Sequence, residues 1–362
     1  MFVATNRKLN PKSQGLSLFG DTPNALGPNE LRLVEVTRQD SGYRTELLQD
    51  KLTRAEVKDL NARFALDLDT TKTWYASLRV ACEIMARAQR ERRHVLIYVH
   101  GYNNDMADVL ATAEALESLY KVIVVPFSWP ANGGGPIGGT AAYLDDKRDA
   151  RVSMDALNRF IDKVNTYHEL LTRVQRERLW RESAEAHPSN PSAVQEAFSA
   201  RLANDCQVTL NLACHSMGNY VLQYALGPSD VASHELVFDN VALIAADANN
   251  PGHPEWVERI QVRNRLYILI NEDDYALAWS RRKPGDEQRE RLGQYLLNLT
   301  ARNARYIDVT AADGVKNAHT YFVGEPVAQN AALKRFFAAA FEGGRGEEPL
   351  RYMSASNTYR FP

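Results

Sequence analysis

The chain has 362 residues, 44% of them hydrophobic and 24% charged, which is typical of a soluble globular protein with one large α/β core or two smaller domains. Its 43 basic and 45 acidic residues give a formal net charge of −2, so the composition favours neither nucleic acid nor an anionic membrane as a partner. No apolar run approaches the roughly 20 residues needed to cross a bilayer. Residues 1–8 also lack the basic-then-apolar order of a signal peptide.

The sequence contains three cysteines, Cys82, Cys206 and Cys214, which is too few for a disulfide framework. Cys206 and Cys214 lie at the two ends of one predicted strand, where an extended backbone separates their Cα atoms by roughly 26 Å, far beyond disulfide reach. We therefore expect reduced thiols and a cytoplasmic location.

The first ninety residues predict two short strands followed by two helices. Alternating apolar segments at 2–5 and 31–36 predict strands, joined by a connection rich in Gly, Pro and Asn. A polar segment, 37–50, follows. Apolar residues near helical spacing then predict helices over 53–66 and 73–91.

The next segment predicts a parallel sheet. Residues 95–99 form a continuous apolar run, which indicates a strand buried on both faces. A helical pattern over 106–120 and a second apolar run at 122–127 follow with short links. Strand, helix and strand in this order predict a right-handed βαβ unit.

A glycine-rich loop at 133–139 contains the pattern Gly-x-Gly-x-x-Gly. A dinucleotide-binding loop must follow its strand directly and open a helix. Here Trp-Pro-Ala-Asn separates the loop from the strand, and Pro136 interrupts it. We interpret it as a surface loop.

A long, highly charged helical stretch follows at 143–181. A break rich in Pro and Asn at 187–191 precedes a second helix at 192–203. Only the first half of this stretch is needed to return to the sheet, so 167–204 predicts an inserted helical hairpin or cap. An ordinary solvated helical excursion explains the same pattern equally well.

Residues 208–213 predict a buried strand and 219–226 a helix, with Ser216 between them and Gly218 two positions later. A hydroxyl at the apex of a sharp strand–turn–helix is the nucleophile elbow of hydrolases, whose pattern is Gly-x-Ser-x-Gly. Cys214 replaces the first glycine and is small enough for the close approach of strand and helix. The alternative is that Ser216 only caps the helix.

The remaining chain predicts three further strands, at 240–245, 266–270 and 305–309. The segment 281–291 is polar and predicted to be exposed, and 327–341 predicts a closing helix. We expect one domain over 1–341 and a mobile C-terminal tail at 342–362.

The predicted strand ends bring together the groups that serine hydrolysis requires, because active groups of an open parallel sheet gather at the carboxyl ends of its strands. Ser216 needs an imidazole to take its proton, and His319 follows the last strand. The imidazole needs a carboxylate, and Asp274 follows the strand before last. Asp273 is the adjacent alternative, and Asp247 after the preceding strand is another.

The oxyanion formed during acyl transfer needs fixed N–H donors. The backbone N–H of Met217 is one candidate, and that of Tyr102, after the first central strand, is the second. His100 and Gly101 shape this loop. His100 as a second catalytic base is the less favoured alternative.

The combination of these motifs resembles an uncharacterised bacterial family of α/β-hydrolases described only as esterase- or lipase-like. The resemblance covers most of 1–10 and 90–340. It is carried by Ala4-Thr5-Asn6-Arg7, Val99-His100-Gly101-Tyr102-Asn103-Asn104, Phe127-Ser128-Trp129-Pro130, Tyr143 with Asp146, the stretch from Ala213 to Gly218, Ala246-Asp247, Asp274-x-Ala276-Leu277 and His319-x-Tyr321.

The resemblance implies an α/β-hydrolase fold, with a mostly parallel sheet flanked by helices and a helical insertion before the nucleophile strand. By position it implies Ser216 as nucleophile, Asp274 as acid and His319 as base, with Tyr102 and Met217 as the oxyanion hole. The helical segment 167–204 is longer than is usual in the family. No substrate is implied.

We therefore expect a serine hydrolase that cleaves an ester, thioester or amide of a small molecule or lipid through an acyl-enzyme. The alternative is a catalytically inactive binding or scaffolding module, because fold does not fix function. A hydrolase acting at lipid surfaces is a third hypothesis, based on aromatic residues near the predicted strand ends: Tyr102, Trp129, Tyr143, Trp279, Tyr321 and Phe322.

No cofactor or metal is expected. The histidines lack the His-Glu-x-x-His spacing of a zinc site, and the acidic pairs lack the spacing of a calcium loop. The sequence gives no indication of oligomeric state.

Overall fold

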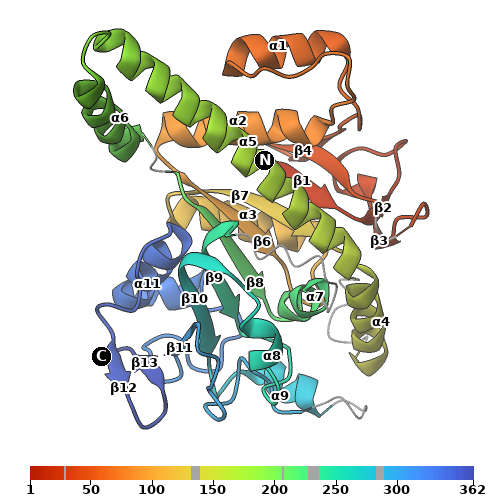
Figure 1. Ribbon diagram of the computed structural model, residues 1–362. Coiled ribbons are helices and arrows are strands. Elements are labelled where there is room, and N and C mark those ends of the chain that lie inside the picture. The colour runs from red at the N-terminus through yellow and green to blue at the C-terminus, as the bar shows by residue number, and fades with distance from the viewer. Residues whose placement is uncertain (28–29, 132–138, 206–207, 227–235, 283–288) are drawn as a thin grey trace.

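The computed structural model describes residues 1–27, 30–131, 139–205, 208–226, 236–282 and 289–362 (Figure 1). Most of the glycine-rich loop and Cys206 lie outside these ranges. The other two cysteines, Cys82 and Cys214, are buried and unpaired.

The centre of the molecule is an eleven-stranded sheet in the order β12-β13-β11-β10-β9-β8-β6-β7-β1-β4-β5. From β13 to β1 every neighbouring pair is parallel, and antiparallel pairs occur at both edges. A separate two-stranded sheet pairs β2 with β3. The strands are β1 (Phe2–Thr5), β2 (Arg7–Leu9), β3 (Phe19–Pro23), β4 (Arg32–Gln39), β5 (Gly42–Leu47), β6 (His94–Val99), β7 (Val122–Ser128), β8 (Leu210–His215), β9 (Phe238–Ile244), β10 (Val262–Ile270), β11 (Ala304–Asp308), β12 (Arg351–Met353) and β13 (Thr358–Arg360).

Helices cover both faces of this sheet. Apolar side chains of α2, α4, α5 and α7 pack on one face, and those of α3 and α11 pack on the other. The long helix α5 crosses the molecule diagonally in Figure 1, with α6 beside its far end. The helices are α1 (Arg54–Phe64), α2 (Ala76–Glu91), α3 (Met106–Leu119), α4 (Gly139–Val152), α5 (Met154–Ala186), α6 (Pro191–Asp205), α7 (Gly218–Ala225), α8 (Pro254–Val257), α9 (Tyr275–Arg281), α10 (Glu325–Gln329), α11 (Ala331–Phe341) and the 3-10 turn η1 (Gly15–Leu18).

The expected βαβ unit is present as β6, α3 and β7, which pair in parallel. Strand β6 is buried along almost its whole length, as its continuous apolar sequence predicts. The α/β architecture predicted from the sequence is therefore confirmed. Among the described residues, no helix is both long and apolar enough to cross a membrane.

The predicted helix over 143–181 is two helices, α4 and α5, which meet at Ser153. The buried Ser153 hydroxyl donates to the carbonyl of Asp149 at 2.7 Å and accepts from the Asn6 amide at 2.9 Å. These bonds tie the junction to the chain after β1. Beyond residue 167, α5 packs against α6, and the Trp180 and Phe198 rings meet edge to face with 5.3 Å between their centroids.

Two other segments differ from expectation. The polar segment 37–50 contains β5, an edge strand that pairs with β4. The expected mobile tail instead forms β12 and β13, and β13 extends the sheet beside β11. Arg360 on β13 binds the Asp308 carboxylate with 2.7 Å between Nε and Oδ2, and Thr358 is fully buried. The tail is ordered because it pairs with an open sheet edge, which local composition does not reveal.

Candidate active site

Ser216 occupies the turn between β8 and α7, in a left-handed backbone conformation with φ of +52°. This conformation is strained for a residue with a Cβ atom and is kept only where its surroundings enforce it. The Ser216 N–H donates to the carbonyl of Ile244 at 3.0 Å, and its own carbonyl accepts from the N–H of Asp247 at 3.1 Å. The turn is thus fixed to the end of β9.

Asn219, in the first turn of α7, completes this fixation. Its buried amide donates to the carbonyls of Cys214, Ser216 and Ile244 at 3.0 to 3.2 Å. This role of Asn219 was not predicted from the sequence. The available signal was an amide in the first turn of a largely apolar helix, which needs partners when it is buried.

The loop after β6 lies directly against this turn. A Cβ atom on Gly101 would lie 2.7 Å from Cβ of Ser216, and one on Gly218 would lie 2.7 Å from the carbonyl oxygens of Val99 and His100. Both positions therefore need glycine. Cys214, at the place of the motif's first glycine, is fully buried in the core, and burial raises the pKa of its thiol.

His319 and Asp274 form a hydrogen-bonded pair with 2.7 Å between Nδ1 and Oδ2. Asp274 directly precedes α9 and caps it, since its other carboxylate oxygen accepts from the N–H groups of Ala276 and Leu277 at 2.9 and 3.0 Å. The Asp274 side chain is fully buried, whereas that of His319 is 15% exposed. With Nδ1 donating to a carboxylate, Nε2 of the neutral ring is the free acceptor.

His215 connects this pair to the elbow. Its ring lies 4.6 Å from the ring of His319, measured between centroids, and its Nε2 lies 3.2 Å from the His319 carbonyl oxygen. Burial holds the pKa of His215 well below its usual value, so the neutral ring donates to that carbonyl. In the described part of the chain, no hydrogen bond joins the Ser216 hydroxyl to His319.

The two alternative carboxylates lie in other surroundings. Asp273 is exposed. Asp247 is buried and pairs with Arg291 at 3.0 Å, while the hydroxyls of Tyr143 and Ser280 donate to its two oxygens. Burial alone lowers the pKa of Arg291, but Asp247 and Tyr143 outweigh it and raise that pKa.

This ion pair corrects one expectation. The segment 281–291 was predicted to be exposed, yet the Arg291 side chain is only 2% exposed. Its partner Asp247 lies 44 positions earlier in the sequence (291 − 247) and becomes a neighbour only through the fold, so no local pattern indicated the contact.

His100 is buried and stacked on Trp129, with 5.2 Å between the ring centroids. Its ring nitrogens lie 2.9 Å from the carbonyl oxygen of Gly101 and 3.2 Å from that of Trp129. Burial and the nearby Arg7 lower its pKa to about 3, so the ring is neutral. These contacts suit a residue that shapes the loop.

Arg7 anchors the same loop from the N-terminus. The buried guanidinium donates to the carbonyls of Asn104 and Ala131 at 2.9 and 3.2 Å, and to the Ser128 hydroxyl at 2.8 Å. Burial lowers its pKa to about 10, at which the group is still charged at neutral pH. Arg7 belongs to a motif that carried the resemblance, but the sequence gave it no individual role.

Met217 follows Ser216 and directly precedes α7, and Tyr102 follows Gly101 in the loop that lies against Ser216. The Tyr102 ring is half-buried and packs edge to face on Tyr143, with 5.5 Å between centroids. Met217 is buried. Among the described residues, no cluster of three or more His, Cys, Asp or Glu side chains could hold a metal ion.

Residues 80–172 match the model of a family described as alpha/beta hydrolase of unknown function (DUF900). The chain has an α/β-hydrolase fold. The resemblance seen in the sequence is thereby confirmed. The matched segment spans β6, the loop with Gly101, α3, β7, α4 and part of α5. A comparison with curated proteins finds no match.

The matched segment does not include Ser216, Asp274 or His319. Their assignment to a triad therefore depends on their geometry. Of the aromatic residues considered for an acyl pocket, four are buried and Trp279 is 64% exposed.

Proposed function

We propose that this protein is a serine hydrolase that cleaves an ester, thioester or amide through an acyl-enzyme. Ser216 is the nucleophile, His319 the general base and Asp274 the residue that orients the base. The supporting observation is the Asp274–His319 pair, held by His215 beside a serine whose backbone is strained at φ of +52°. Strained backbone that is held in place by the surrounding contacts is common at catalytic sites.

In the proposed reaction, Nε2 of His319 takes the proton of the Ser216 hydroxyl while Oγ attacks the carbonyl carbon of the substrate. The tetrahedral intermediate collapses as His319 gives this proton to the leaving group. Water then attacks the acyl-enzyme, with His319 again accepting a proton, and Ser216 is released with its hydroxyl restored. Asp274 remains ionised and stabilises the imidazolium.

The Ser216–His319 hydrogen bond is absent in the described structure, which is compatible with this mechanism. Catalytic hydrogen bonds in the absence of substrate are often long, and they tighten in the complex. The His319 side chain retains 15% exposure, so its ring is accessible from solvent.

We further propose that the N–H groups of Met217 and Tyr102 stabilise the oxyanion. The support is the close packing of the loop on the elbow, where Gly101 leaves no room for a Cβ atom beside Ser216. Arg7 and His100 hold that loop through contacts with the carbonyl oxygens of Asn104 and Gly101. Fixed backbone donors cost no reorganisation when charge develops on the substrate.

Labelling with a fluorescent fluorophosphonate tests the proposal, with the adduct located by mass spectrometry. We expect the label on Ser216 and its loss in Ser216→Ala and His319→Ala. A panel of short- and long-chain esters and thioesters then identifies the acyl group. A folded protein that takes no label would contradict the proposal and favour the alternative, an inactive binding module.

A further inference from the structure

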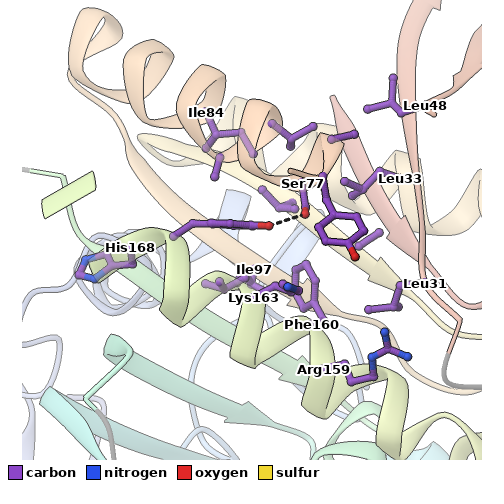
Figure 2. Close-up of a pocket in the computed structure, with 18 of the residues that line it drawn as sticks. Leu31, Leu33, Leu48, Ser77, Ile84, Ile97, Arg159, Phe160, Lys163 and His168 are labelled. Atoms are coloured by element: carbon purple, nitrogen blue, oxygen red, sulfur yellow. Dashed lines mark hydrogen bonds between the residues drawn. The ribbon is translucent and has the colours of Figure 1, made fainter. Parts of the chain in front are cut away.

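A cavity of about 420 Å³ lies between helices α2 and α5 and the sheet beneath them (Figure 2). The volume falls in the range of small-molecule binding sites. None of Ser216, Asp274 and His319 lines the cavity. It is therefore a different site from the candidate active site.

The cavity extends across much of the sheet. Its floor runs across five neighbouring strands, from Leu210 on β8 past Ile97 on β6, Val125 on β7 and Ala4 on β1 to Leu33 on β4. Neighbouring strands lie about 4.8 Å apart, so this row spans about 19 Å. A row of this length accommodates one extended hydrocarbon chain.

Apolar side chains around the cavity are left only partly buried. Leu31 and Leu33 on one side, Ile84 on α2 and Val164 and Leu171 on α5 line the space and retain exposed surface. Figure 2 shows Leu31, Leu33 and Ile84 directed into it. Removing such surface from water is favourable by about 25 cal/mol per Å², which a hydrocarbon ligand would gain.

The charged residues that line the cavity favour binding of an anionic ligand. The cavity is lined by four cationic side chains, and its two carboxylates, Glu30 and Asp50, both pair with Arg32. The ammonium of Lys163 lies 5.3 Å from the centroid of the Tyr75 ring and 6.0 Å from that of Tyr167. No carboxylate among the described residues forms an ion pair with Lys163.

Lys163 and Arg159 stand one helical turn apart on the exposed edge of α5, where Figure 2 shows both beside the cavity. A ligand carboxylate at this edge would contact both cations and water, while its chain lay over the sheet. Leaving the head group at the surface avoids the cost of burying a charge.

We propose that this cavity binds a single-chain amphiphile with an anionic head group, of the class of a medium- or long-chain fatty acid. The chain lies between α2 and α5, and the carboxylate binds Lys163 with Arg159 adjacent. The ligand is bound and not cleaved, because Ser77, the serine among the lining residues, is hydrogen-bonded to the Tyr167 hydroxyl at 2.8 Å and to no histidine of the described chain. The proposal stands whether or not Ser216 is catalytic.

Calorimetric titration of the full chain with octanoate, decanoate and laurate tests the proposal. Each added methylene buries more apolar surface, so we expect the affinity to rise about fourfold per methylene. Dodecylammonium has the same chain with the opposite charge and is expected to bind at least about tenfold more weakly than laurate.

Two matched pairs of variants locate the site. Ala81→Trp fills the cavity from α2 and is expected to abolish laurate binding, whereas Gln89→Trp, on the exposed end of the same helix, is expected to bind normally. Lys163→Glu is expected to weaken laurate binding at least about tenfold. Arg181→Glu changes the charge equally about 27 Å farther along α5 and is expected to have no effect.

The proposal is overturned if the wild-type protein does not bind laurate, if it binds dodecylammonium with equal affinity, or if Ala81→Trp and Gln89→Trp bind laurate with equal affinity. Thermal unfolding of each variant establishes that it is folded. If Ala81→Trp does not fold, the comparison of Lys163→Glu with Arg181→Glu decides. Retained laurate binding in Ser216→Trp separates this cavity from the candidate active site, and its loss there would place the ligand at Ser216 instead.

Discussion

Nδ1 of His319 lies 2.7 Å from Oδ2 of Asp274, while Oδ1 of the same carboxylate caps helix α9 through two backbone N–H groups. One side chain thus holds a helix and an imidazole at once. The Asp274 carboxylate cannot rotate without losing the cap, so the helix fixes the direction in which the imidazole is held.

Asp274→Asn distinguishes the capping of helix α9 from the interaction with His319. An asparagine keeps an oxygen for the cap, but it carries no charge to stabilise an imidazolium or to select the ring tautomer. We expect kcat to fall roughly a thousandfold to ten-thousandfold with little change in stability. Rates of fluorophosphonate labelling and ester hydrolysis measure this. The adjacent, exposed Asp273→Asn is the control and should react at the wild-type rate. Equal rates in the two variants would exclude Asp274 as the acid.

The second prediction concerns the pH dependence of stability. Burial lowers the pKa of His100 from 6.5 to about 3, so the unfolded chain binds a proton at a pH where the folded chain does not. The stability that the neutral ring contributes is therefore present above about pH 6.5 and is lost as the pH falls toward 3. Each pH unit in this window costs up to about 1.4 kcal/mol.

His100→Asn should reduce the loss of stability that occurs as the pH falls below 6.5. The variant is less stable at neutral pH because its packing on Trp129 is lost, but its free energy of unfolding should decline less steeply between pH 6.5 and 4.5. Urea unfolding at several pH values gives the slope. His187→Asn, at the exposed end of α5, should keep the wild-type slope. An unchanged slope in His100→Asn would mean that His100 is protonated in the folded protein.

Much of the fold follows from sequence because most central strands contain a run of apolar residues. Strands β6, β7, β8, β9, β10 and β11 were all expected within a few residues of their bounds. Patterns of this kind report burial directly. Strands that form only by pairing with another segment were not predicted from the sequence. Strand β5 pairs with β4, and β13 pairs with β11. The residues of β5 and β13 are largely polar and contain no apolar run, so these strands are stabilised by pairing with their neighbours.

Some residues of the candidate site could likewise be predicted from the sequence, and others could not. Strand-end position suggested Asp274 and His319, which the structure brings into contact. It favoured Asp274 over Asp247 but left both open, since both follow strands. The difference lies in Arg291, which neutralises Asp247 and is distant from it in sequence. Likewise, Asn219 and Arg7 act through carbonyl groups that no sequence pattern identifies.

The third prediction tests the buried Arg291–Asp247 pair. Arg291→Met keeps much of the side-chain volume but leaves the Asp247 carboxylate buried without its cation. Breaking a buried pair from one side costs about 3–5 kcal/mol, and we expect the free energy of unfolding to fall by that amount. Urea unfolding measures it. Arg302→Met, which breaks an exposed pair with Glu258, is the control and should change stability little. A similar loss in both variants would show that Asp247 is solvated.

The fourth prediction uses the left-handed backbone of Ser216. A Cβ atom in this conformation costs about 1–2 kcal/mol, and glycine avoids that cost but loses about 0.5–1 kcal/mol through its larger unfolded-state entropy. Ser216→Gly should therefore be more stable than Ser216→Ala by about 0.5–1 kcal/mol, although both lack the hydroxyl and both should be inactive.

The same pair of substitutions at Ser199, which is exposed within helix α6, should give the opposite order. There the backbone is helical and alanine is favoured over glycine by about 1 kcal/mol. Urea unfolding of the four variants therefore yields differences of opposite sign at the two positions. If alanine were the more stable residue at both, the Ser216 backbone would carry no strain. The support that this strain lends to the proposed nucleophile would then be lost, leaving the Asp274–His319 contact as the remaining support.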